Sequence, residues 1–295
     1  MALSEQQKGE LFVASSASLG GFFPIVVVLT YASISGFASL AWSTLIAAVF
    51  FGVLLVYRRK LSELKNLLVW KHCVFVALFI GIAFYSLYFI GLKYTTPGNA
   101  SIIVLLQVLV AFLFFNVYRG EYISNESKLG AVLMLAGAFV LLGENFSVVN
   151  IGDFIILASV VFAPIGNYFQ QEARKLASSE TVMFLRSLIS VPVLFLVMYV
   201  LGASAAMSDL RIALPFLILN GLVLLGVEKM LWIEGIHRIS VTKATALVCV
   251  TPLVTLIFAW ALLQQVPTVW QLLSLVPFTF GVLFLTDQIR LSRMT

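Results

Sequence analysis

Ionisable side chains interrupt long apolar runs of this sequence. Glu228 and Lys229 are neighbours in one run, and Arg186 stands in another. If these runs cross a membrane, each buried charge costs at least about 2.5–3.5 kcal/mol and is expected to face a cavity or a partner. A carboxylate beside an ammonium can bind the two ends of a zwitterion, and a guanidinium can attract an anion. Glu228 is also the candidate for carrying a proton.

The spacing around Glu228 extends this candidate site. Asn220, Leu224, Glu228 and Trp232 recur every four residues, so in an α-helix they form one stripe that carries an amide, a carboxylate and an indole. We predict that the stripe faces a solute. In the alternative interpretation, Glu228 forms a satisfied ion pair or hydrogen bond within the bundle while Lys229 extends towards the membrane surface.

Further polar and aromatic residues lie at membrane depth. Gln107 and Thr251 could each bind solute or join helices through a hydrogen bond, worth about 0.6 kcal/mol on average in a membrane. Arg186 could attract an anionic group or be tied to Glu180. The full set of predicted solute-binding residues is Glu228, Lys229, Trp232, Asn220, Tyr85, Tyr88, Gln107, Asn167 and Thr251.

Glycine and proline mark two candidate hinges. Gly20, Gly21 and Pro24 lie in the first apolar run, and Pro164 and Gly166 lie in the sixth. Proline removes a helical hydrogen bond, and paired interruptions in two halves of a chain are typical of transporter binding sites. Alternatively, these residues only allow helices to pack closely.

The composition indicates elements that span a bilayer. Hydrophobic residues make up 61% of the 295 residues and charged residues only 11%, against about 25% in soluble proteins. Because a spanning helix needs roughly 20 apolar residues, we expect an all-α integral membrane protein with ten transmembrane helices. Their windows are 10–31, 36–57, 72–92, 96–118, 127–144, 151–171, 180–201, 212–233, 240–263 and 268–288.

An internal repeat organises these helices. A shift of 144 residues places Ser35 on Ser179, Gly91 on Gly235 and Ala100 on Ala244. We therefore predict two repeats, 1–144 and 145–295, with five helices each. Because five is odd, the second repeat enters the membrane inverted, and inverted repeats are the architecture of secondary transporters.

Basic residues predict the orientation. One set of loops and both tails hold Lys8, Arg58, Arg59, Lys60, Lys65, Lys71, Arg119, Lys128, Arg174, Lys175, Arg238, Arg290 and Arg293. The opposite face has only Lys93 and Arg211. The positive-inside rule then places both termini in the cytoplasm. Lys243 and Glu144 are expected at membrane boundaries.

Enzymatic and cofactor signatures are not found. His72 and His237 have no metalloprotease or triad-like neighbours, and no phosphate-binding glycine loop occurs. Cys73 and Cys249 have no metal-ligand spacing. We predict no enzyme activity, no cofactor, no metal and no nucleic-acid partner. The expected partners are a small-molecule substrate and the lipid bilayer, with proton coupling or exchange as the driving force, while the oligomeric state stays open.

The pattern resembles the drug/metabolite transporter superfamily, EamA type. The resemblance is carried by Ala100 and Ala244 opening the fourth helix of each repeat, by Thr251-Pro252, and by Gly120-Glu121 followed by Gly130 and Gly137. The second repeat departs from it with Gln264-Gln265, and the basic residue in the second helix occurs only as Arg186, opposite Trp42 in the first repeat. The resemblance implies a basket-like bundle whose helices one, three, four, six, eight and nine line a central cavity, with five and ten at the periphery. Arg186 would then lie outside the lining helices.

We predict a secondary transporter that works by alternating access in a bacterial inner membrane. Amino acids or amino-acid-like metabolites are the expected cargo, and export is the expected direction. The alternatives are a multidrug or hydrophobic-cation exporter and a membrane scaffold that transports nothing.

Overall fold

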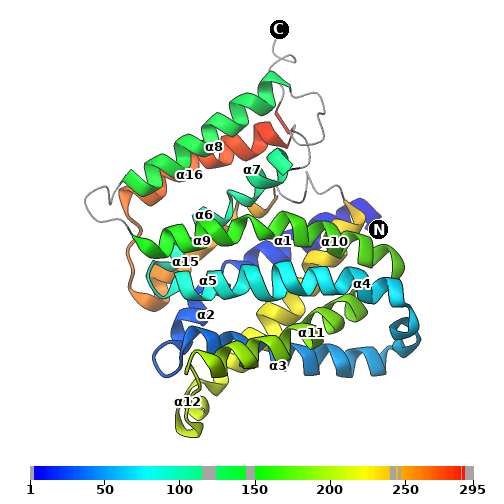
Figure 1. The fold of residues 1–295 in the computed structure, drawn as a ribbon. Helices are drawn as coiled ribbons and strands as arrows, with labels where there is room; N and C mark the ends of the chain where they lie inside the picture. The colour runs from blue at the N-terminus through cyan, green and yellow to red at the C-terminus, as the bar shows by residue number, and fades with distance from the viewer. Residues whose placement is uncertain are drawn as a thin grey trace.

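The computed structural model shows helices packed side by side (Figure 1). It describes residues 3–114, 124–143, 150–239, 244, 247–286 and 288–289. Lys243, Glu144 and the Gly120-Glu121 motif lie outside these residues. Every regular element in the described part of the chain is helical, so the predicted all-α fold is confirmed.

The helices of the first part of the chain are α1 (Glu5–Gly20), α2 (Phe23–Thr30), α3 (Gly36–Tyr57), α4 (Leu67–Val76), α5 (Tyr85–Leu92), α6 (Pro97–Val104), α7 (Gln107–Phe112) and α8 (Asn125–Gly143). Those of the second part are α9 (Ile151–Val160), α10 (Phe162–Leu176), α11 (Ser179–Val200), α12 (Met207–Ile218), α13 (Glu228–Arg238), α15 (Thr251–Leu263) and α16 (Val269–Leu285). A short 3-10 helix, Leu61–Lys65, joins α3 to α4.

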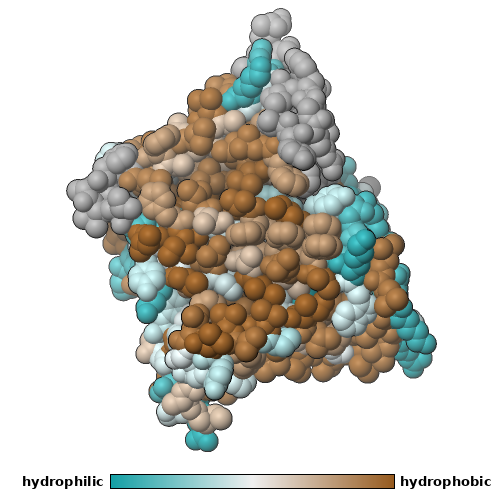
Figure 2. All heavy atoms as spheres, in the orientation of Figure 1, coloured by the Kyte–Doolittle hydropathy of each residue, from teal (hydrophilic) through white to brown (hydrophobic). Residues whose placement is uncertain are grey.

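In several membrane spans, two consecutive helices form one span: α1 and α2 lie in Glu5–Thr30, and α9 and α10 lie in Ile151–Leu176. Within the described residues, seven spans are long and apolar enough to cross a bilayer, and three shorter apolar helices are Pro97–Phe112, Thr251–Leu263 and Val269–Leu285. Hydrophobic side chains cover most of the face in Figure 2, while hydrophilic ones gather towards its left and right margins. This is the surface that a multi-pass membrane protein presents to lipid.

Prolines account for three interruptions within spans. A proline ring clashes with the carbonyl four residues earlier, so the preceding helix ends there. Gly20, four residues before Pro24, is the last residue of α1, and Val160, four before Pro164, is the last of α9. Pro252 likewise follows a turn at 249–250. Proline alone does not decide a break, because Pro192, Pro215 and Pro277 lie inside helices that continue.

The interruptions of the fourth and ninth spans are related by the 144-residue shift. Turns at 105–106 and at 249–250 separate the pieces of these spans. Gln107 is the first residue of α7, and Thr251 is the first of α15. Each polar side chain therefore stands where a new helical piece begins, beside backbone groups released from regular hydrogen bonding.

Two π-helices interrupt the third and eighth spans. Ala77–Phe84 separates α4 from α5, and Leu219–Val227 separates α12 from α13. A π-helix bonds residue i to i+5, which changes the register of side chains on either side, and such segments are frequent at functional sites. Tyr85 and Glu228 each follow directly.

Helices α8 and α16 pair closely at the upper edge of Figure 1. A Cβ added at Gly130 would lie 2.7 Å from the Gly281 carbonyl oxygen, so the two backbones touch there. Glycine is required at this crossing because any side chain would separate the helices. No residue of α8 or α16 lines the interior cavity described below, which is formed by other spans.

Candidate functional site

A cavity of about 170 Å³ lies among the spans. An engineered cavity of about 150 Å³ in another protein binds benzene, so this one can hold a small organic molecule with a single ring. Ten of the predicted solute-binding and hinge residues line it: Gly20, Pro24, Tyr85, Tyr88, Gln107, Asn167, Glu228, Lys229, Trp232 and Thr251. Residues from six different spans, hundreds of positions apart in the chain, are thus brought together.

Glu228 and Lys229 form an ion pair in the cavity wall. Lys229 Nζ lies 2.7 Å from Glu228 Oε2, and Ser16 on α1 donates a hydrogen bond of 2.6 Å to the other oxygen, Glu228 Oε1. The Lys229 ammonium also lies 5.7 Å from the centre of the Phe23 ring. Glu228 is therefore satisfied within the bundle, as the alternative interpretation expects, whereas Lys229 lines the cavity beside it and does not extend towards the membrane surface.

Arg186 on α11 also lines the cavity, which corrects the expectation that it lies outside the lining helices. It is only 3% exposed. Glu180, which the sequence offered as its partner, instead forms an ion pair with Arg58. No residue within the described ranges pairs with or accepts a hydrogen bond from the Arg186 guanidinium, whose carbon lies 5.7 Å from the centre of the Tyr85 ring. A guanidinium is thus available to a ligand.

Aromatic rings form one side of the cavity. The Phe23 ring lies 5.8 Å from Tyr85 and 5.6 Å from Tyr88, and Phe84 stacks on Tyr88 at 5.8 Å. Rings at these separations hold one another in place and present a rigid apolar surface. This surface suits the hydrocarbon part of a solute.

Three amide side chains face the cavity. Gln107 comes from α7, and Asn167 and Gln170 come from α10. Among the described residues, none exchanges a side-chain hydrogen bond with these amides, so their donors and acceptors remain for a solute or for water. Each amide offers two N–H donors and an oxygen acceptor.

Four predicted residues do not line the cavity: Asn220, Gly21, Pro164 and Gly166. Asn220 donates a hydrogen bond of 3.0 Å to Ser43 on α3, so its expected place on the Glu228 stripe does not hold. The stripe assumed α-helical spacing, whereas Leu219–Val227 is a π-helix that shifts the register.

The glycines among these four serve packing. A Cβ on Gly21 would lie 2.6 Å from Val254 Cγ1, and one on Gly166 would lie 2.3 Å from Ile80 Cγ1. The helix interruptions do fall at the predicted hinges, next to Gly20 and Pro24 and just before Pro164. Their role in gating stays a prediction.

Sequence reasoning missed several lining residues, including Ser16, Phe23 and Gln170. Ser16 meets Glu228 across 212 positions of the chain. A serine in a membrane helix gives no sign of such a contact, because it is common wherever helices pack closely. Phe23 could have been suspected from its place beside Pro24, at the helix break.

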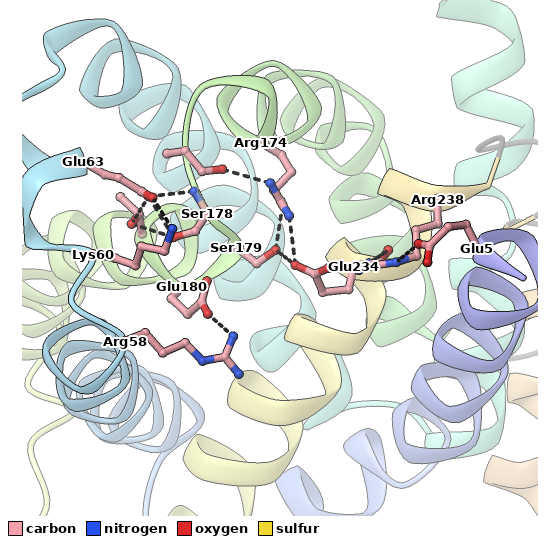
Figure 3. Close-up of polar contacts among 12 residues, drawn as sticks. Glu5, Arg58, Lys60, Glu63, Arg174, Ser178, Ser179, Glu180, Glu234 and Arg238 are labelled. Carbon is pink, nitrogen blue, oxygen red and sulfur yellow. Dashed lines mark hydrogen bonds and ion pairs between the residues drawn. The ribbon is translucent and has the colours of Figure 1, made fainter. Parts of the chain in front are cut away.

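A polar network lies beyond the cavity along α10 and α13, one turn past Gln170 (Figure 3). Glu234 accepts hydrogen bonds from Ser179, from Arg174 at 3.1 Å, and from Arg238. Arg238 also reaches Glu5 at 3.2 Å. The network ties the ends of α1, α10, α11 and α13 together.

A second cluster anchors the connection between α3 and α4 to α11 (Figure 3). Glu63 Oε2 accepts hydrogen bonds from the Ser178 backbone N–H at 2.7 Å, the Ser178 hydroxyl at 2.8 Å and the Thr181 hydroxyl at 2.7 Å. Burial raises the pKa of the Glu63 carboxyl, but these hydrogen bonds and that from Lys60 outweigh it, so the pKa lies below the ordinary value. The carboxylate is held at the N-terminus of α11, where the helix dipole favours it.

Comparison with known proteins identifies the family. The model of the EamA-like transporter family matches residues 7–143 and again 150–287. The chain belongs to the EamA-like transporter family. Relatives of this transporter include the "Uncharacterized transporter YyaM" of Bacillus subtilis, 25% identical over 273 residues, which cover 87% of this chain and 86% of that protein. An "Uncharacterized transporter" of Methanothermobacter thermautotrophicus is 26% identical over 206 residues, or 68% of this chain and 59% of that protein.

A solved crystal structure shares the fold of this EamA-like transporter. It superposes with a TM-score of 0.70 at 20% identity and covers 96% of this chain and 98% of that chain. At this identity the likeness concerns the fold alone. The chain is therefore a multi-pass membrane transporter of the EamA-like family, and its cargo has to be argued from the cavity.

Proposed function

We propose that this protein is a secondary transporter that moves amino acids or amino-acid-like metabolites across the membrane by alternating access. The observation that carries the proposal is one cavity in which both signs of charge, free amides and a rigid aromatic surface converge. These are the groups that a small amphipathic zwitterion needs.

Each part of such a solute has a partner in the cavity. The carboxylate of Glu228 can accept an ammonium, in competition with Lys229 at 2.7 Å. Tyr85 and Tyr88 can contact an apolar side chain, and Gln107 and Asn167 can complete its hydrogen bonds. Because Glu228 exchanges partners in this scheme, it is also our candidate for proton coupling.

The helix interruptions support alternating access. Spans one, four, six and nine are each broken beside the cavity, which lets their halves tilt separately. We propose that the breaks at Gly20 and Pro24 in the first repeat and at Pro164 in the second act as hinges, and that the two repeats are inverted relative to each other. We further propose cytoplasmic termini, a bacterial inner membrane and outward transport, as the distribution of basic residues and the family resemblance favour.

Exchange in proteoliposomes tests the proposal. Glu228→Gln and Trp232→Ala are expected to abolish counterflow of radiolabelled amino acids, because one removes the cavity's carboxylate and the other part of its wall. The matched controls are Glu126→Gln on α8 and Trp260→Ala, which is 56% exposed. Unchanged flux in both cavity variants, with folding verified by gel filtration, would refute this site.

A multidrug exporter is the second candidate, and the aromatic wall is the observation that favours it. Against it, Arg186 and Lys229 together outweigh the single carboxylate of Glu228, so the described cavity wall repels hydrophobic cations. Counterflow that is selective for amino acids supports the first function, whereas counterflow of hydrophobic cations alone supports the second. No exchange of either class would favour the scaffold.

A further inference from the structure

We propose that Arg186 is the receptor for a carboxylate of the solute, which makes the cargo a class of small carboxylic acids with an apolar or aromatic body. This inference rests on the proposed function and adds to it the group that decides specificity. Under it, Glu228 recognises the ammonium end in competition with Lys229, while Arg186 recognises the acid end.

The first support is the electrostatic isolation of Arg186. Arg186 as a whole is 3% exposed and lines the cavity, and no carboxylate or carbonyl in the described part of the protein accepts a hydrogen bond from its guanidinium. The acid of the cavity wall is occupied, since Glu228 pairs with Lys229 and accepts a hydrogen bond from Ser16, and Glu180, about one and a half turns earlier on α11, pairs with Arg58. A buried cation without an anion is costly, and a solute carboxylate would relieve that cost.

The second support is that neighbouring residues position Arg186. Ser190 donates a hydrogen bond of 2.8 Å to the Arg186 backbone oxygen. Gly81 on the π-helix Ala77–Phe84 lets α11 approach, since a Cβ there would lie 3.2 Å from Ser190 Cβ and closer still to the Ser190 hydroxyl. The Tyr85 ring lies 5.7 Å from the guanidinium carbon and limits its movement. An ordered guanidinium offers the paired N–H donors that bind a carboxylate with two parallel hydrogen bonds.

The third support is the arrangement of the other cavity groups. The Tyr85 ring lies beside Arg186 and also belongs to the aromatic wall with Phe23 and Tyr88. A carboxylate on Arg186 therefore places the adjoining carbon chain against these rings. A solute with only an ammonium would leave Arg186 unpaired and would add a third positive charge beside Lys229. The wall thus selects for the acid.

Four related probes separate the two ends of the solute: phenylalanine, 3-phenylpropanoate, 2-phenylethylamine and phenylalanine methyl ester. Binding to the purified full-length protein is measured by calorimetry, and counterflow is measured in proteoliposomes. We expect phenylalanine and 3-phenylpropanoate to bind at least about tenfold more tightly than the amine and the ester, because these two lack the carboxylate. This comparison needs no variant.

Arg186→Gln is expected to weaken binding of 3-phenylpropanoate by about 10- to 100-fold, and to leave the weak binding of 2-phenylethylamine unchanged or improved. Arg186→Lys should fall between, since lysine keeps the charge and loses the paired donors. The control is Arg211→Gln, at an exposed arginine of α12, which should match the wild type.

Three results would overturn the inference. If the wild type binds and exchanges 2-phenylethylamine as well as 3-phenylpropanoate, or if Arg186→Gln binds the acid normally, Arg186 is not the receptor, and the proposed transport function still stands. If none of the four probes binds or exchanges, this inference and the proposed amino-acid transport both fail.

Discussion

Replacing Gly81 with alanine probes the contact between the third span and α11 that positions Arg186. The new Cβ would lie 2.1 Å from Ser190 Oγ and 3.2 Å from Ser190 Cβ. The first distance is much shorter than a van der Waals contact. The Ser190 hydroxyl can rotate away from the new Cβ only by losing its hydrogen bond to the Arg186 backbone oxygen. The second requires α11 to move by a few tenths of an ångström.

The expected size of the effect follows from these distances. Over-packing of this kind costs typically about 1–3 kcal/mol, whereas alanine in place of glycine in an unobstructed helix gains about 1 kcal/mol. We therefore expect Gly81→Ala to lower the free energy of unfolding by up to about 2 kcal/mol in the wild-type background. In a Ser190→Ala background the hydroxyl is absent, so the same change should be at least about 1 kcal/mol less costly.

Denaturant unfolding of the two single variants and the double variant in detergent measures this coupling. The control is Gly20→Ala, because a Cβ on Gly20 meets no atom closer than 3.6 Å. If Gly81→Ala proves as stable as the wild type, or costs the same in both backgrounds, the contact does not position Arg186 as described. Weaker binding of 3-phenylpropanoate should accompany the loss of stability.

Two further predictions concern residues outside the cavity. The pKa of Glu63 in the folded protein is below the ordinary value of 4.5, so the unfolded protein binds more protons at this residue. The Glu63 carboxylate therefore stabilises the fold fully above about pH 4.5, and this stabilisation disappears as the pH falls through the lower folded pKa. Thermal unfolding from pH 7 to pH 3 should therefore show a smaller loss in Glu63→Gln than in the wild type, and identical profiles would contradict the assignment. Asn220→Ala should remove the hydrogen bond to Ser43 and lower the free energy of unfolding by about 0.6 kcal/mol. The KM for exchange should not change, and a raised KM would show that Asn220 belongs to the binding site.

The sequence alone was enough for the membrane fold and for much of the cavity wall. Long apolar windows predict spanning helices because lipid leaves backbone groups no other partner. Glu228 and Lys229 could be singled out because charge at that depth is costly and needs a reason. The prolines at 24 and 164, each with glycine close by, predicted helix interruptions, since the clash of a proline ring is local.

Only the tertiary structure decided how these residues are oriented. Asn220 turned towards Ser43 because a π-helix changed the register between it and Glu228, which a count of four residues cannot foresee. Arg186 lines the cavity with no ion pair to a described residue, while Glu180 on the same helix meets Arg58 across 122 positions of the chain. Such pairings depend on the rotation and crossing of whole helices, and hydrophobic periodicity specifies which face of a helix is apolar without specifying which neighbour it meets.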